Sequence, residues 1–217
     1  MSLARRWAED WPTRPEVGVR LLGLWEEPRR RYHGPQHLAE VLAAGELLGC
    51  TRAERLALWF HDASLHAVRP LARAERLALW FHDAVQHGRP GEDERASAAL
   101  ALRWLPAAGW SGAEAAEVAR LVALTEHHRP AAGDGPGARV CDADLAVLGA
   151  PPERYRESVA QLRAEQPALD DAQWRAARRA VVEDLLGAHR YATTTGRELW
   201  GARARANLRD ELSSLRG

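Results

Sequence analysis

The sequence predicts an all-α protein, and two observations support this. Ala, Leu, Arg and Glu dominate nearly every segment, with apolar residues three and four positions apart, and β-branched residues are sparse. Such residues have high helix propensity, and this spacing places apolar side chains on one helix face. Apolar residues make up 46% and charged residues 28% of the 217 residues, as in globular proteins. We therefore expect one domain over residues 1–217, with an insertion, rather than two independent cores.

Helices are expected throughout the chain, and no strand. Capping boxes mark two helix starts, since Thr51 precedes Glu54 and Ser111 precedes Glu114 by three residues. Glycine and proline in the segments 88–91 and 130–137 break the helical hydrogen-bond ladder, so both segments are predicted loops. In chain order the predicted helices are Glu16–Arg31, Pro35–Leu48, Arg52–Ala63, Leu71–Ala84, Asp93–Trp104, Gly112–His127, Pro152–Glu165, Asp171–Leu186 and Arg197–Leu215.

One segment of the chain is repeated. Arg-Ala-Glu-Arg-Leu-Ala-Leu-Trp-Phe-His-Asp-Ala occurs at residues 52–63 and again, identically, at residues 73–84. Weaker similarity extends the copies to 52–70 and 73–90, and two copies are too few for a solenoid, so we interpret them as a tandem duplication. Only one copy is expected to occupy the core position. The other should form an extra amphipathic helix whose Trp and Phe need burial, which predicts a homodimer.

Charge and composition argue against nucleic-acid and membrane partners. The 30 basic and 30 acidic side chains cancel, so no net field attracts long polyanions. No apolar run approaches the roughly 18 residues of a membrane span, and no apolar stretch follows the charged N-terminus. Cys50 and Cys141 lie in no Cys-x-x-Cys motif, which indicates reduced thiols. The expected location is the cytoplasm.

Histidine and aspartate residues that could bind a metal ion recur along the chain. His33 and His37 are four residues apart, and they share one helix face if both are helical. Mixed nitrogen and oxygen ligands suit Mn, Fe, Mg, Co, Ni or Zn. Adjacent helical side chains diverge by about 100°, so a His-Asp pair can bind one ion only if the ion lies between them. The other candidates are two His-Asp pairs and an acidic pair: His61-Asp62, His82-Asp83, and Asp142 with Asp144.

The order of these motifs resembles the HD superfamily, whose pattern is a first His, a His-Asp pair and a distant Asp that bind metal within a helical bundle. The closest resemblance is to an uncharacterised bacterial branch of predicted metal-dependent phosphohydrolases, over roughly residues 20–215. It implies an HD-type helical bundle, extended here by the extra helix of the duplication. The segments that carry it are Tyr32-His33 with His37, Trp80-Phe81-His82-Asp83-Ala84, Asp93-Glu94-Arg95 with Ser97, Thr125 with His128, Asp142-Ala143-Asp144-Leu145, and Ala204-Arg205 with Asn207-Leu208.

The resemblance implies a divalent cation with these ligands: His37, His82, Asp83 and Asp144. The second copy of the repeat is favoured because residues 93–97, which follow it, resemble the family's sequence that leads into the next helix. His61 and Asp62 of the first copy are the alternative pair. Asp144 is favoured because Ala143-Asp144-Leu145 resembles the family's last motif, whereas Asp142 could cap the short helix that follows.

The resemblance also implies catalytic roles. Tyr32-His33-Gly34-Pro35-Gln36-His37 is similar to the Tyr-His-Asn-x-x-His motif of cyclic-nucleotide phosphodiesterases, although Gly34 replaces Asn. His33 is then the general acid, with a buried hydrogen-bonding histidine as the alternative, and Asp83 is the other expected catalytic residue. His128 is expected to bind the substrate phosphate. Its alternative roles are a second metal site or an interaction with a helix dipole.

Together these motifs predict a metal-dependent phosphohydrolase that acts on a phosphate monoester or diester. We expect a nucleotide or another small phosphorylated metabolite as the substrate, because the balanced charge offers no grip on long polyanions. A bound divalent cation lowers the pKa of water toward neutrality, and Arg31 or Arg129 could neutralise phosphate. Two alternatives stay open: a di-iron oxygenase or lyase on the same scaffold, with His127 and His128 completing a second metal site, and a non-catalytic module that binds metal or nucleotide.

Overall fold

The computed structural model describes residues 2–63, 92–187 and 191–215, and every regular element in these residues is helical. The all-α prediction is therefore confirmed. In chain order the elements are α1 (Leu3–Asp10), α2 (Pro15–Trp25), α3 (Pro35–Leu47), α4 (Arg52–Phe60), α6 (Glu92–Ala107), α7 (Gly112–Leu124), α8 (Gly135–Asp144), the 3-10 helix η1 (Leu145–Gly149), α9 (Pro152–Ala164), α10 (Asp171–Gly187) and α11 (Thr194–Ser214).

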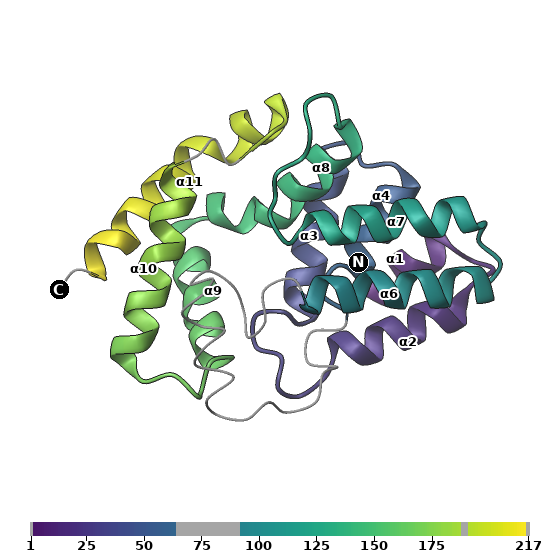
Figure 1. Cartoon of the computed structure of the whole chain (residues 1–217), viewed down its shortest axis with the longest axis horizontal. Coiled ribbons are helices and arrows are strands. Elements are labelled where there is room, and N and C mark those ends of the chain that lie inside the picture. Colours follow the sequence, from purple (N-terminus) through teal and green to yellow (C-terminus); the bar gives the residue numbers. More distant parts are fainter. Residues whose placement is uncertain (1, 64–91, 188–190, 216–217) are drawn as a thin grey trace.

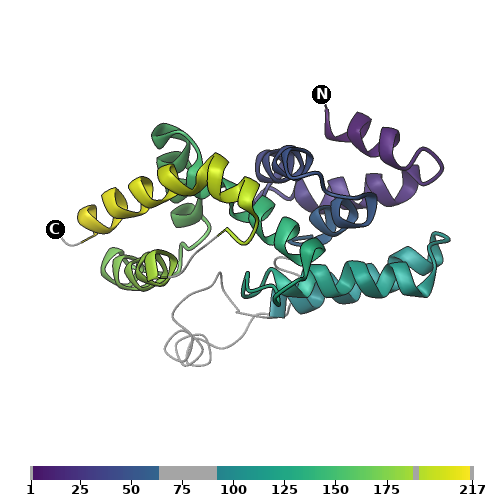
Figure 2. The same cartoon turned by 90° about the horizontal axis from the view of Figure 1, so that it is seen from above.

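The helices form two groups that lie side by side (Figures 1 and 2). The larger group contains α1 to α4 and α6 to α8, and its apolar core includes Trp25, Leu38 and Trp59. The smaller group contains α9 to α11, and its core includes Tyr155 and Val182. The 3-10 helix η1 contacts both α3 and α11, so it connects the two groups.

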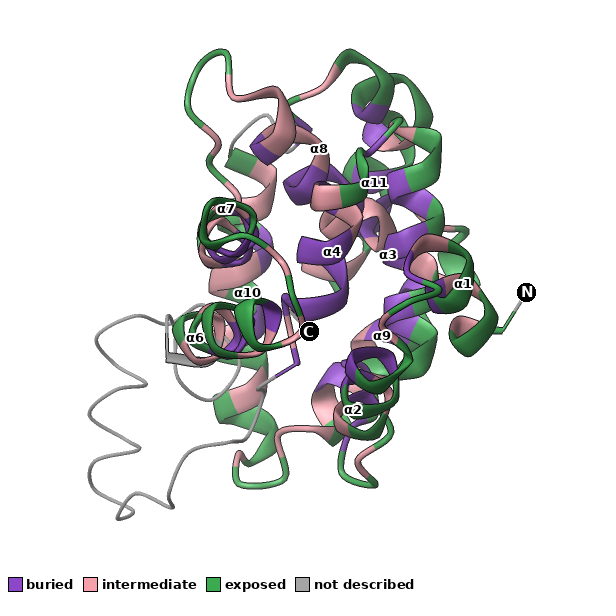
Figure 3. Ribbon diagram, turned by 90° about the vertical axis from the view of Figure 1, so that its right-hand side faces the viewer, coloured by how far each residue is buried: buried purple, intermediate pink, exposed green. Residues whose placement is uncertain are grey.

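Helix α4 lies at the centre of the larger group, and Figure 3 shows most of it as buried. Its residues 56–60 are all buried, so this part of the helix is enclosed on every side rather than on one face. Trp25 Nε1 donates a hydrogen bond of 3.1 Å to the carbonyl oxygen of Trp59, which ties α2 to α4. This packing fixes the position of the residues that follow Phe60.

A capping box and an ion pair fix the other end of α4. Thr51 and Glu54 form the predicted capping box, and Ser111 and Glu114 form the other one at the start of α7. Glu54 is 2% exposed, and its carboxylate also pairs with Arg139 of α8 through contacts of 2.6 and 2.7 Å. Burial opposes ionisation, but Arg139 and Thr51 hold the pKa of Glu54 below its usual value.

This difference between the two capping boxes predicts unequal effects of the same substitution. We expect Glu54→Gln to lower the free energy of unfolding by about 2 kcal/mol, since glutamine keeps the cap but leaves Arg139 without its carboxylate. Glu114→Gln, at an exposed cap, should cost less than about 0.5 kcal/mol. Denaturant unfolding at pH 7 measures both variants, and equal costs would contradict the role of Arg139.

The same pair predicts a pH dependence. Because the pKa of Glu54 is lowered on folding, its stabilisation is complete above the unfolded value of about 4.3 and is lost as the pH falls through the folded value. The difference in unfolding free energy between wild type and Glu54→Gln should therefore shrink below about pH 4. A difference that stays constant from pH 7 to pH 3 would contradict this account.

Some helix boundaries differ from the prediction. Helix α1 was not predicted, although it buries Trp7 against the core. Helix α8 begins at Gly135, inside the predicted loop 130–137, because the Asp134 side chain accepts a hydrogen bond of 3.0 Å from the Gly137 N–H. A proline in the first helical turn is compatible with this start.

The second copy of the repeat lies outside the described residues. Three expectations that depend on it therefore stay predictions: the helix Leu71–Ala84, the extra helix of the duplication, and the homodimer that the extra helix implied. The first copy forms α4, which ends at Phe60 rather than at Ala63. In the part of the chain that is described, no helix combines the length and the apolar character that crossing a bilayer requires.

Candidate metal centre

His37 enters the protein core from the first turn of α3. Gly34 is the N-cap residue and Pro35 begins the helix, where the fixed φ of proline suits the first turn. The His37 imidazole is 1% exposed and lies near the rings of Tyr32 and Trp25, with centroid distances of 4.6 and 6.3 Å. Its Nδ1 atom has no hydrogen-bond partner among the described residues, so its Nε2 atom carries the interactions with the centre.

His61 is the C-cap residue of α4, and one hydrogen bond fixes its tautomer. Its Nδ1 atom lies 2.7 Å from the carbonyl oxygen of Leu58. Because a carbonyl oxygen can only accept, Nδ1 carries the hydrogen and donates it. The Nε2 atom of the neutral ring then has a lone pair available for a cation, which is the tautomer that a metal-binding histidine uses.

Three potential ligand atoms from distant parts of the chain converge beyond the end of α4. His37 Nε2 and His61 Nε2 are 3.2 Å apart, and Asp144 Oδ1 is 3.3 Å from each of them. Ligands that surround one cation at about 2.1 Å are separated by about 3.0 to 3.4 Å, depending on the coordination angle. These three atoms therefore have a spacing that fits one divalent cation. We refer to His37, His61 and Asp144 as the metal-ligand group.

Asp62 places a further oxygen at the edge of this group. Its Oδ2 atom is 3.2 Å from His61 Nε2, 3.5 Å from His37 Nε2 and 4.0 Å from His33 Nε2. Carboxylate oxygens and imidazole nitrogens together suit first-row divalent metals. Asp62 is thus a candidate fourth ligand that also faces His33.

The electrostatics of the group favour a positive charge at its centre. Burial raises the pKa values of Asp62 and Asp144, but the neighbouring imidazoles, above all His61, hold both well below the usual range. Burial opposes protonation of His37 and His61, yet the two carboxylates raise the pKa values of both rings. Since metal binding displaces protons from such ligands, a divalent cation can replace the charge that the protons supply.

Asp144 is the last residue of α8, and a histidine orients its carboxylate. His128 Nε2 lies 2.7 Å from Asp144 Oδ2, which leaves Oδ1 to face His37 and His61. Among the described residues, His128 is the non-glycine residue with a positive φ, 51°, a conformation that is uncommon for residues with a side chain. His128 therefore contacts a candidate ligand. Its predicted contact with substrate phosphate stays a prediction.

Asp142 has a structural role that differs from the alternative considered for it. Its carboxylate accepts hydrogen bonds from the backbone N–H groups of Ala192 and Thr193, at 2.7 and 2.8 Å, and from the Thr193 hydroxyl at 2.6 Å. Thr193 is the N-cap residue of α11. Asp142 thus anchors the start of α11 and does not cap the short helix η1. Asp144, and not Asp142, belongs to the metal-ligand group.

Glu165, directly after α9, holds the segment that carries His33. Its Oε1 atom accepts hydrogen bonds from the backbone N–H groups of Arg31, Tyr32 and His33 at 2.7, 2.8 and 3.0 Å. Its Oε2 atom lies 2.5 Å from His33 Nδ1. Burial opposes ionisation, but these hydrogen bonds, led by His33, lower the pKa of Glu165 to about 2. The carboxylate is therefore ionised and accepts Nδ1–H, which turns His33 Nε2 toward Asp62.

Arg30 joins the His33 segment to the end of α4. The guanidinium is buried, and it donates to the carbonyl oxygens of His33, Asp62 and Ala63 at 3.1, 2.7 and 3.1 Å. Carbonyl oxygens at the C-terminal end of a helix carry partial negative charge, so a cation is favourable there. Arg30 thus holds the backbone of His33 and of Asp62 at a fixed separation.

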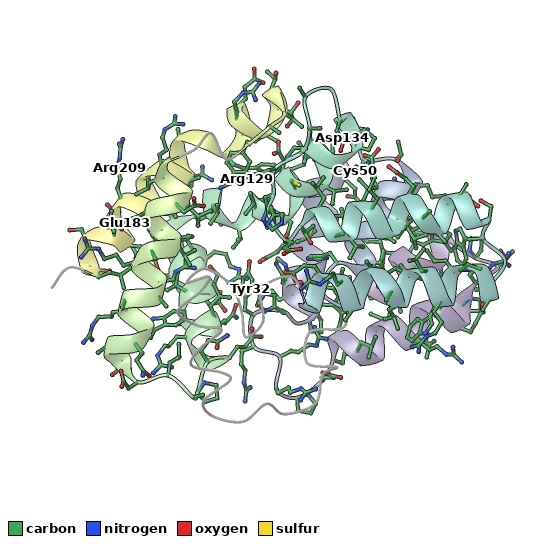
Figure 4. All side chains as sticks on the ribbon, in the orientation of Figure 1. Tyr32, Cys50, Arg129, Asp134, Glu183 and Arg209 are labelled. Atoms are coloured by element: carbon green, nitrogen blue, oxygen red, sulfur yellow. The ribbon has the colours of Figure 1, made fainter. Side chains whose placement is uncertain are left out.

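A cavity of about 160 Å³ opens beside the metal-ligand group. Figure 4 shows Tyr32, one of its lining residues, at the junction between the two groups of helices. Neither Arg31 nor Arg129, the two arginines that the sequence suggested for phosphate binding, is among its lining residues. Its lining includes His33, His37, Asp62, His128 and Asp144 at the candidate metal centre, Tyr155, Ser158 and Leu162 of α9, and Arg178 of α10.

No protein-family model matches the chain, and comparisons with curated proteins and with solved structures found no match either. The structure itself contains a His/His/Asp group that could bind a metal, within an all-helical fold. These two features are compatible with an HD domain.

The sequence predicted part of this centre. His37 and Asp144 come together as the resemblance implied. His82 and Asp83, the favoured pair, lie outside the described residues, and the structure brings the alternative pair, His61 and Asp62, to the centre. Two residues that position the centre, Glu165 and Arg30, were not predicted from the sequence. No local pattern marks Glu165, which is 132 positions from His33.

Proposed function

We propose that this protein is a metal-dependent phosphohydrolase of the HD type, acting on a small phosphate monoester or diester. The observation that carries this proposal is the convergence of His37 Nε2, His61 Nε2 and Asp144 Oδ1 beside a cavity that His33 also lines. When bound, a divalent cation lowers the pKa of water and withdraws charge from a phosphoryl oxygen. The cavity volume, below the range of about 300–1,000 Å³ typical of drug-sized ligands, favours a small substrate.

His33 is the proton donor in this proposal. In the imidazolium form both ring nitrogens carry hydrogen, and Glu165 accepts Nδ1–H. The hydrogen on Nε2 is then the one available to the leaving group. As a water oxygen bonds to phosphorus and the phosphorus–oxygen bond of the leaving group breaks, this proton passes to the departing oxygen and His33 becomes neutral. The proton released by the attacking water returns His33 to the imidazolium form. Asp62, 4.0 Å from Nε2, supports the positive charge of the ring before the transfer.

The candidate metal centre suits a mononuclear hydrolase, since one group of converging ligands is found in residues 2–63, 92–187 and 191–215. His127, which was expected to help complete a second metal site, lines the cavity, with a side chain that is 66% exposed and an Nε2 atom 3.6 Å from Glu126. The di-iron oxygenase or lyase stays an alternative prediction.

Assays of the metal-loaded protein test this function. After chelation and reloading with Mn²⁺, Fe²⁺, Co²⁺ or Zn²⁺, the protein should hydrolyse members of a panel of phosphate monoesters and diesters, and His37→Ala should lose this activity. Protein that binds one of these metals but hydrolyses no phosphate ester of the panel would contradict the proposed function.

Glu165 provides a further prediction, because it acts on His33 and not on the metal ligands. In Glu165→Gln the amide oxygen can still accept the hydrogen bonds from the backbone N–H groups of Arg31, Tyr32 and His33. The amide nitrogen, however, cannot accept His33 Nδ1–H. We expect turnover to fall about 10-fold with metal affinity and KM within about two-fold of wild type. Glu157→Gln, at an exposed carboxylate of α9, the helix that ends just before Glu165, is the matched control. Loss of metal binding in Glu165→Gln, or equal turnover in both variants, would contradict this role.

A further inference from the structure

Arg178 of α10 is a cation on the cavity wall that the proposed reaction does not use. Its side chain is 8% exposed and lies among the residues that line the cavity. Burying a guanidinium costs free energy unless it is paired, so its position needs an explanation. The contacts of Arg178 provide part of that explanation.

Two neighbours fix the orientation of the Arg178 guanidinium. Nε and Nη2 donate to the two carboxylate oxygens of Glu211 at 2.7 and 3.1 Å, and Nη2 lies 3.5 Å from the Tyr155 hydroxyl. Tyr155 donates its own hydrogen to Glu211. This two-point pairing is rigid, and it balances the charge of Arg178.

The third nitrogen of Arg178 keeps its donor capacity. Nη1 makes no hydrogen bond within the described residues, and it is not one of the fully enclosed unpaired atoms found among them. A guanidinium has five N–H donors in fixed directions, so Nη1 can donate to a ligand while Nε and Nη2 hold Glu211. Because the ion pair is neutral overall, an uncharged acceptor oxygen fits this position without an added charge.

Six aliphatic side chains contribute to the lining of the cavity, together with the carboxylates of Glu94 and Asp184 and the side chains of Thr125, His127 and Ser158. The cavity volume of about 160 Å³ is on the order of the 150 Å³ apolar cavity that holds one benzene molecule. The carbon portion of a ligand there should therefore be small, and the aliphatic side chains of the lining favour an apolar one. The apolar lining residues are Leu145, Val147, Leu148, Leu162, Val181 and Leu185.

We propose that Arg178 recognises an uncharged acceptor oxygen at the far end of the substrate. The substrate class is then a small phosphate ester whose phosphate lies at the metal-ligand group, whose carbon portion is apolar, and whose distal oxygen accepts from Arg178 Nη1. This inference rests on the proposed function for the placement of the phosphate. Arg178 is a specificity residue in this account and takes no part in bond breaking.

Binding of non-hydrolysable phosphonates tests the proposal by calorimetry on the metal-loaded protein. The probes are phenylphosphonate, 4-acetylphenylphosphonate, which adds an uncharged oxygen, and 4-carboxyphenylphosphonate, which adds a charged one. A hydrogen bond to a charged donor corresponds to roughly 10- to 100-fold in affinity, so wild type should bind the acetyl compound at least about 10-fold more tightly than phenylphosphonate. The carboxy compound should gain less than the acetyl compound.

Variants of the buried pair separate recognition from structure. Arg178→Gln should bind the acetyl and phenyl compounds within about two-fold of each other, whereas Glu211→Gln, which disturbs the same pair but keeps the arginine, should retain the preference. If Arg178→Gln does not fold, the double variant Arg178→Met with Glu211→Leu replaces the pair with apolar side chains and serves the same purpose. A preference for the acetyl compound that persists without Arg178, or no preference in wild type, would overturn the proposal.

The outcomes distinguish this inference from the proposed function. An Arg178-dependent preference among the phosphonates supports the inference even if none of the corresponding esters is hydrolysed, a result that would remove the hydrolase. Hydrolysis of phosphate esters with no preference for a distal oxygen would leave the hydrolase and remove the role of Arg178.

Discussion

Replacing His61 with alanine should lower the affinity for a divalent cation by at least about 100-fold and abolish hydrolysis. The reason is geometric: His61 Nε2 is 3.2 Å from His37 Nε2 and 3.3 Å from Asp144 Oδ1, so its loss leaves two of the three converging atoms. Partners outside the ligand shell alone typically contribute 10- to 100-fold to metal affinity, and a direct ligand should contribute more. Elemental analysis after dialysis, with calorimetric titration of the chelated protein, measures this change.

The duplication provides a matched control for this experiment. The other eleven residues of the repeat are identical in the copy that contains His61 and in the copy that contains His82, so local sequence cannot distinguish the two histidines. We expect His82→Ala to retain the metal and the activity. Near-ultraviolet circular dichroism of the chelated variants should show that both are folded. Loss of metal in His82→Ala together with retention in His61→Ala would reverse the assignment in favour of the second copy.

Replacing His33 with glutamine should lower turnover by about 100- to 10,000-fold while metal affinity stays near that of wild type. General acid catalysis by a positioned side chain contributes this much when the leaving oxygen is strongly basic. His33 is 4% exposed and supplies none of the three converging atoms, although its ring lies beside that of His37, so glutamine should leave His37, His61 and Asp144 in place to bind the metal. Steady-state kinetics with metal titration of the same preparation measures both quantities.

The dependence on the leaving group makes this prediction specific to a proton donor. An ester of 4-nitrophenol needs little protonation of its departing oxygen, so His33→Gln should retain much more activity on it than on an alkyl phosphate. Comparable losses on the two esters would show that His33 contributes to positioning or binding and does not donate the proton.

The helical fold follows from local properties of the sequence. Helix propensity, apolar spacing and the capping boxes at Thr51 and Ser111 act over a few residues, and the structure contains both boxes. Boundaries that depend on a single side chain were less predictable. Helix α8 starts in a segment rich in glycine and proline because Asp134 caps it, a contact that composition alone does not reveal.

The candidate metal centre was predictable where a residue belongs to a motif. His37 and Asp144 could be identified in this way, but the choice between two identical His-Asp pairs depends on which copy packs in the core, a tertiary property. In the described structure α4, whose C-cap residue is His61, packs against α3, α7 and α8. Glu165 and Arg30 could not be predicted, because their roles arise from contacts between segments far apart in the chain.

The most direct test of this account is anomalous diffraction from crystals of the protein loaded with Mn²⁺ or Zn²⁺, recorded at the absorption edge of the metal. We expect one strong anomalous peak about 2.0 to 2.3 Å from His37 Nε2, His61 Nε2 and a carboxylate oxygen of Asp144. A peak bound by other residues, or a fully loaded crystal with no peak within coordination distance of these three side chains, would contradict it.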